Sequence, residues 1–240
     1  MIDVRNLSYV YNPKTPFTSQ ALFDVNLKIE DGDFFGIIGG TGSGKSTLIN
    51  LMERFYTPAV GTVEFCGKPA AEYDVAFMRG KIGYVPQRAA VLRGTLESNL
   101  TIADENASRE RQQSALALAQ ASELWDALGP DGQIADGGKN LSGGQRQRVS
   151  IARALCRDNL LYLFDDVTSA LDYKTERDFI NAMKTVRGAK IFVSQRISAV
   201  SGCDDIIVLD GGRIVGRGTH ETLKRDCPLY AEFCASQSEG

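Results

Sequence analysis

The sequence contains no long hydrophobic run. Its longest apolar stretches, residues 160–164 and 206–209, are far shorter than the roughly 20 residues that a helix needs to cross a bilayer. The N-terminal segment MIDVRNLSYVY has no apolar core of the kind that signal peptides carry. From the sequence alone, we therefore expect a membrane role to require another polypeptide or a segment outside this chain.

Paired cysteines and an excess of basic charge are also absent. The five cysteines of the 240 residues are scattered and form no C-x-x-C pair, which favours reduced cytosolic thiols over disulfides or a zinc site. The formal net charge is −3 and the Lys and Arg residues are dispersed, so no basic patch predicts nucleic-acid binding. We find no internal repeat and no low-complexity tract.

One short glycine-rich segment stands out from this ordinary composition. Residues 39–47, GGTGSGKST, fit the phosphate-loop pattern G-x-x-x-x-G-K-[ST]. Glycines allow backbone turns with positive φ, so that N–H groups at a helix N-terminus can face the phosphates. In this pattern Lys45 would contact the β- and γ-phosphates, and the Ser46 hydroxyl would bind Mg²⁺. The predicted nucleotide-binding residues are Gly39, Gly40, Thr41, Gly42, Ser43, Gly44, Lys45, Ser46 and Thr47.

The segments on either side of this loop have the strand–loop–helix order that the pattern requires. Residues 34–38 form a short apolar run typical of a buried parallel strand. Residues 47–55 form a predicted helix whose apolar side chains share one face. Those side chains are Leu48, Ile49, Leu51, Met52 and Phe55.

Strands and helices alternate along the rest of the chain. The expected strands cover residues 3–11, 21–29, 61–65, 81–85, 160–164, 191–193 and 206–209. A helical lobe is expected at 95–128, followed by a glycine-rich connector at 129–139 and a further helix over 149–156. This alternation predicts the α/β class with a largely parallel central sheet.

Two further segments carry residues suited to nucleotide chemistry. The apolar strand 160–164 would place Asp165 and Asp166 at the carboxyl edge of the sheet, where open α/β folds bind their ligands. We expect Asp165 to hold Mg²⁺ through water. The string LSGGQRQR begins at residue 141 and would open a helix with bare N–H groups and the Ser142 hydroxyl.

These segments resemble the nucleotide-binding domain of an ATP-binding cassette (ABC) transporter over nearly the whole chain. LSGGQ at 141–145 matches the family's signature, and SALD at 169–172 matches its D-loop. YVPQ at 84–87 resembles the Q-loop, which implies that Gln87 lies near Mg²⁺ and the attacking water. Asp165 matches the Walker B aspartate. The signature residues that the resemblance assigns to ATP are Ser142, Gly143, Gly144 and Gln145.

The resemblance also implies a fold. It implies a P-loop NTPase (RecA-like) core with a mostly parallel sheet, an N-terminal antiparallel β subdomain and an inserted α-helical subdomain. Residues 1–87 and 157–240 would form the β subdomain and the core, and residues 88–156 the helical subdomain with the signature. Tyr11 falls where the family stacks an aromatic ring on adenine. Tyr9 lies two positions away on the same strand face, and a tyrosine packed in the core is the alternative for Tyr11.

Partners follow from the same resemblance. In this family two ATP molecules lie between two domains, and the signature of each domain completes the site of the other as they close. We therefore expect a second nucleotide-binding domain, a different chain, and the transmembrane domain of a transporter at the cytoplasmic face of the membrane, with no nucleic-acid partner. The tail, with GTHE at 218–221, Tyr230 and Gln237, resembles exporter-type cassettes.

Two positions depart from the family pattern. Directly after the Walker B aspartate the family has Glu, whereas this chain has Asp166, and the switch histidine is replaced by Gln195. The single histidine, His220, lies in the terminal segment, and we expect a structural or surface role for it. Because the binding motifs are intact, the resemblance implies a degenerate site of a heterodimeric exporter that binds ATP and cleaves it slowly. Its catalytic positions would be Asp166, Gln195 and Gln87.

Three other functions remain open from the sequence. A stand-alone ATPase subunit of an importer fits the missing membrane segment but not the exporter-like tail. A nucleic-acid-acting ATPase would usually carry a long coiled-coil insert or two cassettes, and neither occurs in this sequence. A regulatory module that only binds nucleotide would fit Asp166 and Gln195, although a carboxylate at position 166 favours slow hydrolysis over none.

Overall fold

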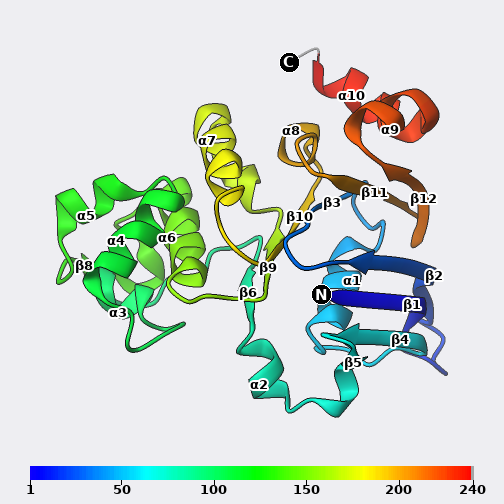
Figure 1. Ribbon diagram of the computed structural model, residues 1–240, viewed down its shortest axis with the longest axis horizontal. Helices are drawn as coiled ribbons and strands as arrows, with labels where there is room; N and C mark the ends of the chain where they lie inside the picture. Colours follow the sequence, from blue (N-terminus) through cyan, green and yellow to red (C-terminus); the bar gives the residue numbers. More distant parts are fainter. Residues whose placement is uncertain (239–240) are drawn as a thin grey trace.

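A large sheet forms the centre of the protein, which we describe from a computed structural model over residues 1–238 (Figure 1). Its strands are β3 Phe34–Ile38, β6 Ile82–Val85, β9 Leu161–Asp165, β10 Ala189–Ser194, β11 Asp205–Asp210 and β12 Arg213–Gly218. They lie in the order β12-β11-β3-β10-β9-β6. Neighbours from β11 to β6 pair in parallel, and β12 pairs antiparallel to β11. This arrangement confirms the predicted mostly parallel sheet.

A smaller antiparallel sheet near the N-terminus has the order β2-β1-β4-β5. Its strands are β1 Ile2–Tyr11, β2 Ser19–Ile29, β4 Val60–Phe65 and β5 Lys68–Pro69. Buried apolar and exposed polar residues alternate along the end of β2, as expected for a strand with one face in the core. A third antiparallel pair, β7 Gly94–Thr95 with β8 Gln133–Ile134, joins the two segments that flank the helices between residues 96 and 128.

Helices lie around the large sheet and in a group beside it. The longer ones are α1 Lys45–Met52, α4 Arg109–Leu118, α6 Gly143–Leu155, α7 Tyr173–Met183 and α10 Pro228–Ser238. The shorter ones are α2 Val75–Arg79, α3 Leu96–Leu100, α5 Ser122–Leu128, α8 Ile197–Val200 and α9 His220–Asp226. Helices α3 to α6 gather on the left of Figure 1, away from the small sheet. Within residues 1–238, no helix combines the length and apolar composition that a bilayer crossing needs.

The large sheet separates two apolar cores. Phe35 and Ile37 of β3 pack with Leu48 of α1 and with the small sheet. Phe34 and Ile38 of the same strand belong to the other core, with helices α6 and α7. A strand covered on both faces has no solvent side, which explains the continuous apolar run in the sequence. Each fully buried side chain of this size stabilises the fold by about 1.5–3 kcal/mol.

Parallel pairing brings the functional segments to one edge of the sheet. Ile38, the last residue of β3, pairs with Ser194, the last residue of β10. β9 ends beside them at Asp165, which pairs within β10 at the preceding residue. The phosphate loop therefore emerges beside Asp166 and Gln195, although it lies more than one hundred residues before both of them along the chain.

Two local predictions were wrong in detail. The helix expected at 47–55 spans Lys45–Met52, because Arg54 has a left-handed φ of 58° that ends it. Phe55 therefore lies outside the helix and is 51% exposed instead of buried. The connector expected at 129–139 contains β8 and a short 3-10 turn. The division into residues 1–87 with 157–240, and 88–156, stays a prediction.

Candidate functional site

The phosphate loop joins β3 to α1 and requires glycine at two positions. A Cβ atom at Gly39 would lie 2.2 Å from the Leu209 carbonyl oxygen, where no side chain fits. Gly44 has a φ of 106°, and a Cβ atom there would lie 2.7 Å from Cδ2 of Leu22. Helix α1 begins at the next residue, so its positive N-terminal end faces the loop. The loop therefore has the steric form that the predicted anion-binding turn requires.

The Lys45 ammonium group folds back onto this loop. It donates hydrogen bonds of 2.7 Å to the carbonyl oxygens of Gly39 and Gly40 and approaches the Ser43 hydroxyl at 3.3 Å. Burial lowers the pKa of Lys45, and the negative charges of Asp166 and Asp165 partly oppose that decrease. A buried cation held by neutral carbonyl oxygens is suited to transfer its bonds to an incoming phosphate, which is a charged acceptor.

A cavity of about 360 Å³ opens beside the loop. Its walls are residues 42–47, Tyr11, residues 19–21 and the turn 211–212. The Tyr11 hydroxyl lies 3.0 Å from Oγ1 of Thr47, at one end of this cavity. Tyr9 packs against the core instead, with its ring stacked on Tyr56 at 5.2 Å. The position of Tyr11 therefore supports its predicted role against the adenine ring, and the role itself stays a prediction.

Asp165 lies at the end of β9 in a mostly buried position. Burial and the neighbouring charge of Asp166 raise the pKa of its carboxyl group, while Lys45 and a hydrogen bond with Tyr84 lower it. A buried carboxylate beside a second one favours a bound cation, which relieves both costs. The predicted ligands Ser46, Gln87 and Asp165 offer a hydroxyl, an amide oxygen and a carboxylate, the hard oxygen donors that Mg²⁺ prefers. These residues therefore fit Mg²⁺.

Asp166 is held by three residues from two segments, the Q-loop and β10. Its Oδ2 atom accepts a hydrogen bond of 3.0 Å from Gln87, and Oδ1 accepts one of 3.1 Å from the Ser194 hydroxyl. The backbone N–H of Asp166 donates to the Val193 carbonyl oxygen at 2.7 Å. The residue has a left-handed φ of 48° and is only 9% exposed. The structure thus brings the predicted residues Gln87, Asp165 and Asp166 together.

Gln195 is exposed directly after β10 and faces the phosphate loop. The Thr41 hydroxyl lies 3.5 Å from Gln195 Oε1, at the outer limit of a hydrogen bond. His220 lies elsewhere, at the start of α9, where its Nδ1 atom is 2.8 Å from the Tyr230 hydroxyl. That place agrees with the structural role expected for the histidine and separates it from the switch position.

The signature lies at the N-terminus of α6 and does not line the cavity of its own phosphate loop. Ser142 caps the helix by accepting the Gln145 N–H at 3.2 Å, and Gln145 accepts the Ser142 N–H at 2.8 Å. Ser142 and Gly143 are exposed. Within one chain, the structure therefore leaves the predicted signature residues apart from the phosphate-binding residues.

Three residues that shape the site were missed from the sequence. Ser194 orients Asp166, and its position at the end of a parallel strand directly before Gln195 was a usable signal. Tyr84 bonds to Asp165 from inside the Q-loop motif. Gly212 donates its N–H to the Ser43 carbonyl oxygen at 3.0 Å, and no sequence pattern indicated that contact between distant segments.

Comparisons with known proteins agree with this geometry. Residues 22–169 match the family model described as "ABC transporter". The chain is 43% identical over 222 residues to an uncharacterized ABC transporter ATP-binding protein of Mycobacterium bovis, covering 90% of this chain and 38% of that protein. It is 38% identical over 243 residues to the toxin RTX-I translocation ATP-binding protein of Actinobacillus pleuropneumoniae, covering 99% of this chain and 34% of that protein.

A solved structure gives the same result in three dimensions. The structure of a bacterial Atm1-family ABC exporter with ATP bound has a TM-score of 0.91 at 32% identity, covering 98% of this chain and 41% of that chain. This chain therefore spans less than half the length of the relatives named here. The predicted P-loop NTPase fold is confirmed. The chain belongs to the ABC transporter family, as a nucleotide-binding ATPase domain with exporter-type relatives.

Proposed function

We propose that this chain powers an exporter by ATP-driven association of two nucleotide-binding domains. One observation carries the proposal: the chain holds the predicted phosphate-binding edge and a signature whose residues Ser142 and Gly143 are exposed at the N-terminus of α6, but keeps the two apart. A site whose parts lie on different surfaces can be completed by a second domain, with Ser142 supplied from the partner. The transmembrane domain of a transporter, at the cytoplasmic face of the membrane, would then respond to closure.

The residues at this edge have separate tasks in the proposed reaction. Lys45 and the loop N–H groups bind the phosphates of ATP and hold the γ-phosphate for attack. Ser46, Gln87 and Asp165 would hold Mg²⁺, which neutralises phosphate charge when it is bound. Asp166 accepts the proton of the attacking water, and Gln195 donates a hydrogen bond from its amide to the γ-phosphate.

We infer that this chain's own site is degenerate. Asp166 is one methylene shorter than the family's glutamate, and its two oxygens are engaged by Gln87 and Ser194. Because a misplacement of about 1 Å can cost about a hundredfold in rate, we expect slow hydrolysis here. Gln195 is neutral and always lacks the charge that a histidine can carry. The intact signature would serve ATP held by a different, glutamate- and histidine-bearing partner.

Two other functions would use the same site. A stand-alone importer subunit would bind ATP in the same way, and the exporter-type relatives argue against it. A regulatory module would bind ATP without turnover. The carboxylate of Asp166, which lies at the site and beside Gln87, favours slow hydrolysis over this alternative.

The test compares steady-state Mg-ATP hydrolysis by the chain with that of the double variant Asp166→Glu, Gln195→His. A gain of about tenfold or more, equivalent to about 1.4 kcal/mol of barrier, supports a site that lacks only its cleavage residues. Equal rates with tight ATP binding in both proteins would contradict the degenerate site. A Lys45→Met version of the double variant controls for contaminating ATPases, because it should lose ATP binding.

A mixing experiment tests completion by the partner. The double variant with Ser142→Arg added has repaired cleavage residues but no working signature, so alone it should turn over slowly. Adding the unmodified chain supplies an intact signature, and the rate should exceed the sum of the two separate rates. The matched control adds the unmodified chain with Ser142→Arg, which should give only the sum. A strictly additive rate with both partners would overturn the proposed dimer mechanism.

A further inference from the structure

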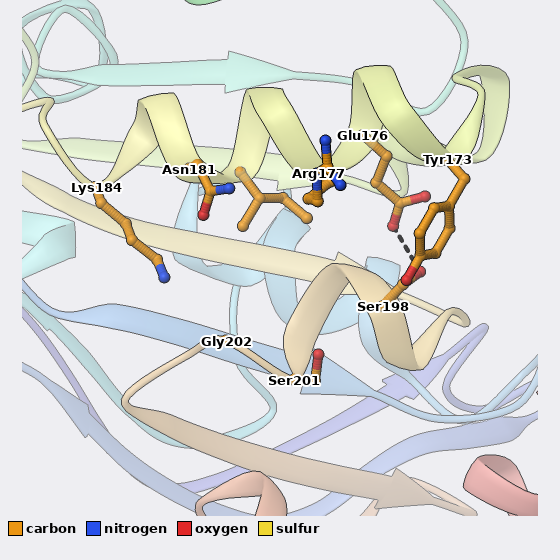
Figure 2. Close-up of a pocket in the computed structure, with 9 residues that line it drawn as sticks. Tyr173, Glu176, Arg177, Asn181, Lys184, Ser198, Ser201 and Gly202 are labelled. Atoms are coloured by element: carbon orange, nitrogen blue, oxygen red, sulfur yellow. Dashed lines mark hydrogen bonds between the residues drawn. The ribbon is translucent and has the colours of Figure 1, made fainter.

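The backbone around Gln195 is anchored by side chains on both sides of it in the sequence. The N–H of Arg196 donates to the Ser194 hydroxyl at 3.0 Å. The Arg196 guanidinium lies 3.2 Å from the buried carboxylate of Glu176 on α7. Figure 2 shows Ser198 of α8 facing the same carboxylate, to which its hydroxyl donates at 2.7 Å. These contacts tie the segment to α7 but leave the carbonyl oxygen of Gln195 to another partner.

That partner comes from the C-terminal helix. Gln237 of α10 donates from Nε2 to the Gln195 carbonyl oxygen at 2.8 Å. Its Oε1 atom accepts the N–H of Ile197, also at 2.8 Å. Ile197 is the first residue of α8, so its N–H is one of the donors that a helix start leaves without an intrahelical partner. A single amide group thus satisfies two backbone groups on either side of Arg196.

Glutamine is suited to this contact because it offers a donor and an acceptor on one planar group. The contact is also separate from the docking of α10. Tyr230 docks the helix, since its ring is fully buried and its hydroxyl lies 2.8 Å from His220. Gln237, by contrast, is exposed. Loss of its amide should therefore free the Gln195 backbone without releasing the helix.

The side chain of Gln195 has little else to fix it. Within residues 1–238, its side-chain contact is the long 3.5 Å approach to the Thr41 hydroxyl of the phosphate loop. Its reach toward a bound γ-phosphate is therefore governed by its backbone. A backbone shift of about 1 Å is enough to cost about a hundredfold in rate at a catalytic position.

We propose that Gln237 is a positioning residue for ATP turnover at this chain's own site. It fixes the backbone from Gln195 to Ile197, so that docking of the C-terminal helix controls where residue 195 reaches toward the phosphate loop. The kinetic part of this proposal rests on the proposed ATPase function. The structural part does not, and each part has its own measurement.

The first measurement is amide hydrogen exchange by NMR in the 240-residue chain and in Gln237→Ala. The Ile197 amide should exchange about tenfold faster in the variant, because it loses its acceptor. The Ala231 amide of α10, which donates to the Cys227 carbonyl oxygen, should keep its parent rate. Ser236→Ala is the matched control, since within the described residues its hydroxyl bonds to its own helix, at the Phe233 carbonyl oxygen. Unchanged exchange at Ile197, or equal acceleration at Ala231, would overturn the proposal.

The second measurement is the ATPase rate in the background of Asp166→Glu with Gln195→His. Adding Gln237→Ala there should lower kcat by about tenfold and leave KM for ATP within about twofold, the pattern of a lost transition-state interaction. An unchanged kcat, or a rise in KM alone, would overturn the positioning role. If the background variant itself gains no activity, the proposed degenerate site fails, while the exchange experiment still decides whether Gln237 anchors the segment.

Discussion

Asp166 accepts a hydrogen bond from Gln87, with 3.0 Å between Oδ2 and Nε2, although the two residues lie 79 positions apart. The other carboxylate oxygen accepts the Ser194 hydroxyl at 3.1 Å. The ends of two neighbouring strands and the Q-loop therefore set the orientation of Asp166 together. A residue held in this way has a defined place at the site, which makes substitutions there informative.

Replacing Asp166 with Asn should leave ATP binding intact and lower its hydrolysis. The amide keeps the shape of the carboxylate but cannot accept a proton from water, so single-turnover hydrolysis should fall by about tenfold or more. Because Asp166 raises the pKa of Asp165 through its charge, the pKa of Asp165 should fall in the variant. Asp131→Asn, at an exposed position, is the control. An unchanged rate would exclude Asp166 as the proton acceptor.

Alanine should be tolerated at Gly40 but not at Gly39. A Cβ atom at Gly39 would lie 2.2 Å from the Leu209 carbonyl oxygen, whereas at Gly40 it would meet nothing within 4 Å. Overpacking of this kind costs about 1–3 kcal/mol or more, which lowers Tm by roughly 3–10 °C for a chain of this size. Thermal unfolding of the two variants checks this, and equal Tm values would mean that the loop can shift away from Leu209.

Glu53 should make stability depend on pH. Its side chain is only 3% exposed at the end of α1, and among residues 1–238 its Oε2 atom has no hydrogen-bond partner. Burial raises the pKa of Glu53 to about 8, an effect that Arg79 opposes and Asp165 increases. Because the folded pKa lies above the ordinary value of 4.5, the folded protein keeps a proton that the unfolded chain releases. Stability should therefore fall as pH rises from 4.5 toward 8 and be lowest above that range.

Glu53→Gln should remove this dependence. The free energy of unfolding of the variant, measured in urea, should exceed that of the parent by on the order of 3 kcal/mol at pH 8, with the difference shrinking toward pH 5. Glu105→Gln, at an exposed position, should show no such difference. A gain that is the same at both pH values would mean that packing, not protonation, distinguishes the two proteins.

The aromatic ring of Tyr11 should support nucleotide binding more than its hydroxyl does. Tyr11→Ala removes a wall of the cavity next to Thr47 and should weaken ATP binding by about tenfold, in line with the worth of one base stacked on an aromatic ring. Tyr11→Phe keeps the ring and loses the hydroxyl's contacts with Thr47, at 3.0 Å, and with Tyr56, so its Kd should stay within about threefold of the parent. Fluorescence titration with an ATP analogue measures both. Equal Kd values for Tyr11→Ala and the parent would assign the stacking role to another residue.

Much of this site could be predicted because its parts are local. A strand buried on both faces requires an apolar run, which Phe34–Ile38 supplies, and the positive φ of the turn requires the glycine found at position 44. The same holds for the cap formed by Ser142 and Gln145, three residues apart. The end of α1 was less predictable, because the left-handed residue Arg54 carries no sequence signal that would exclude a longer helix.

The relationships between distant residues depended on the fold. Ser194 and Gln87 meet at Asp166 because of the strand register, which no pattern in the chain predicts. A parallel sheet aligns strand ends from separate segments of the chain. The contact of Gln237 with Gln195 likewise follows from where α10 packs.

Residue types within short stretches of the chain were enough to predict the phosphate loop, the signature, the two departures from the family pattern and the class of fold. The packed fold was needed to show which groups hold Asp166 and the Gln195 backbone. It also placed Ser142 away from its own phosphate loop. A hydrogen bond between remote residues depends on the strand register and helix packing of the whole fold, which no short segment encodes.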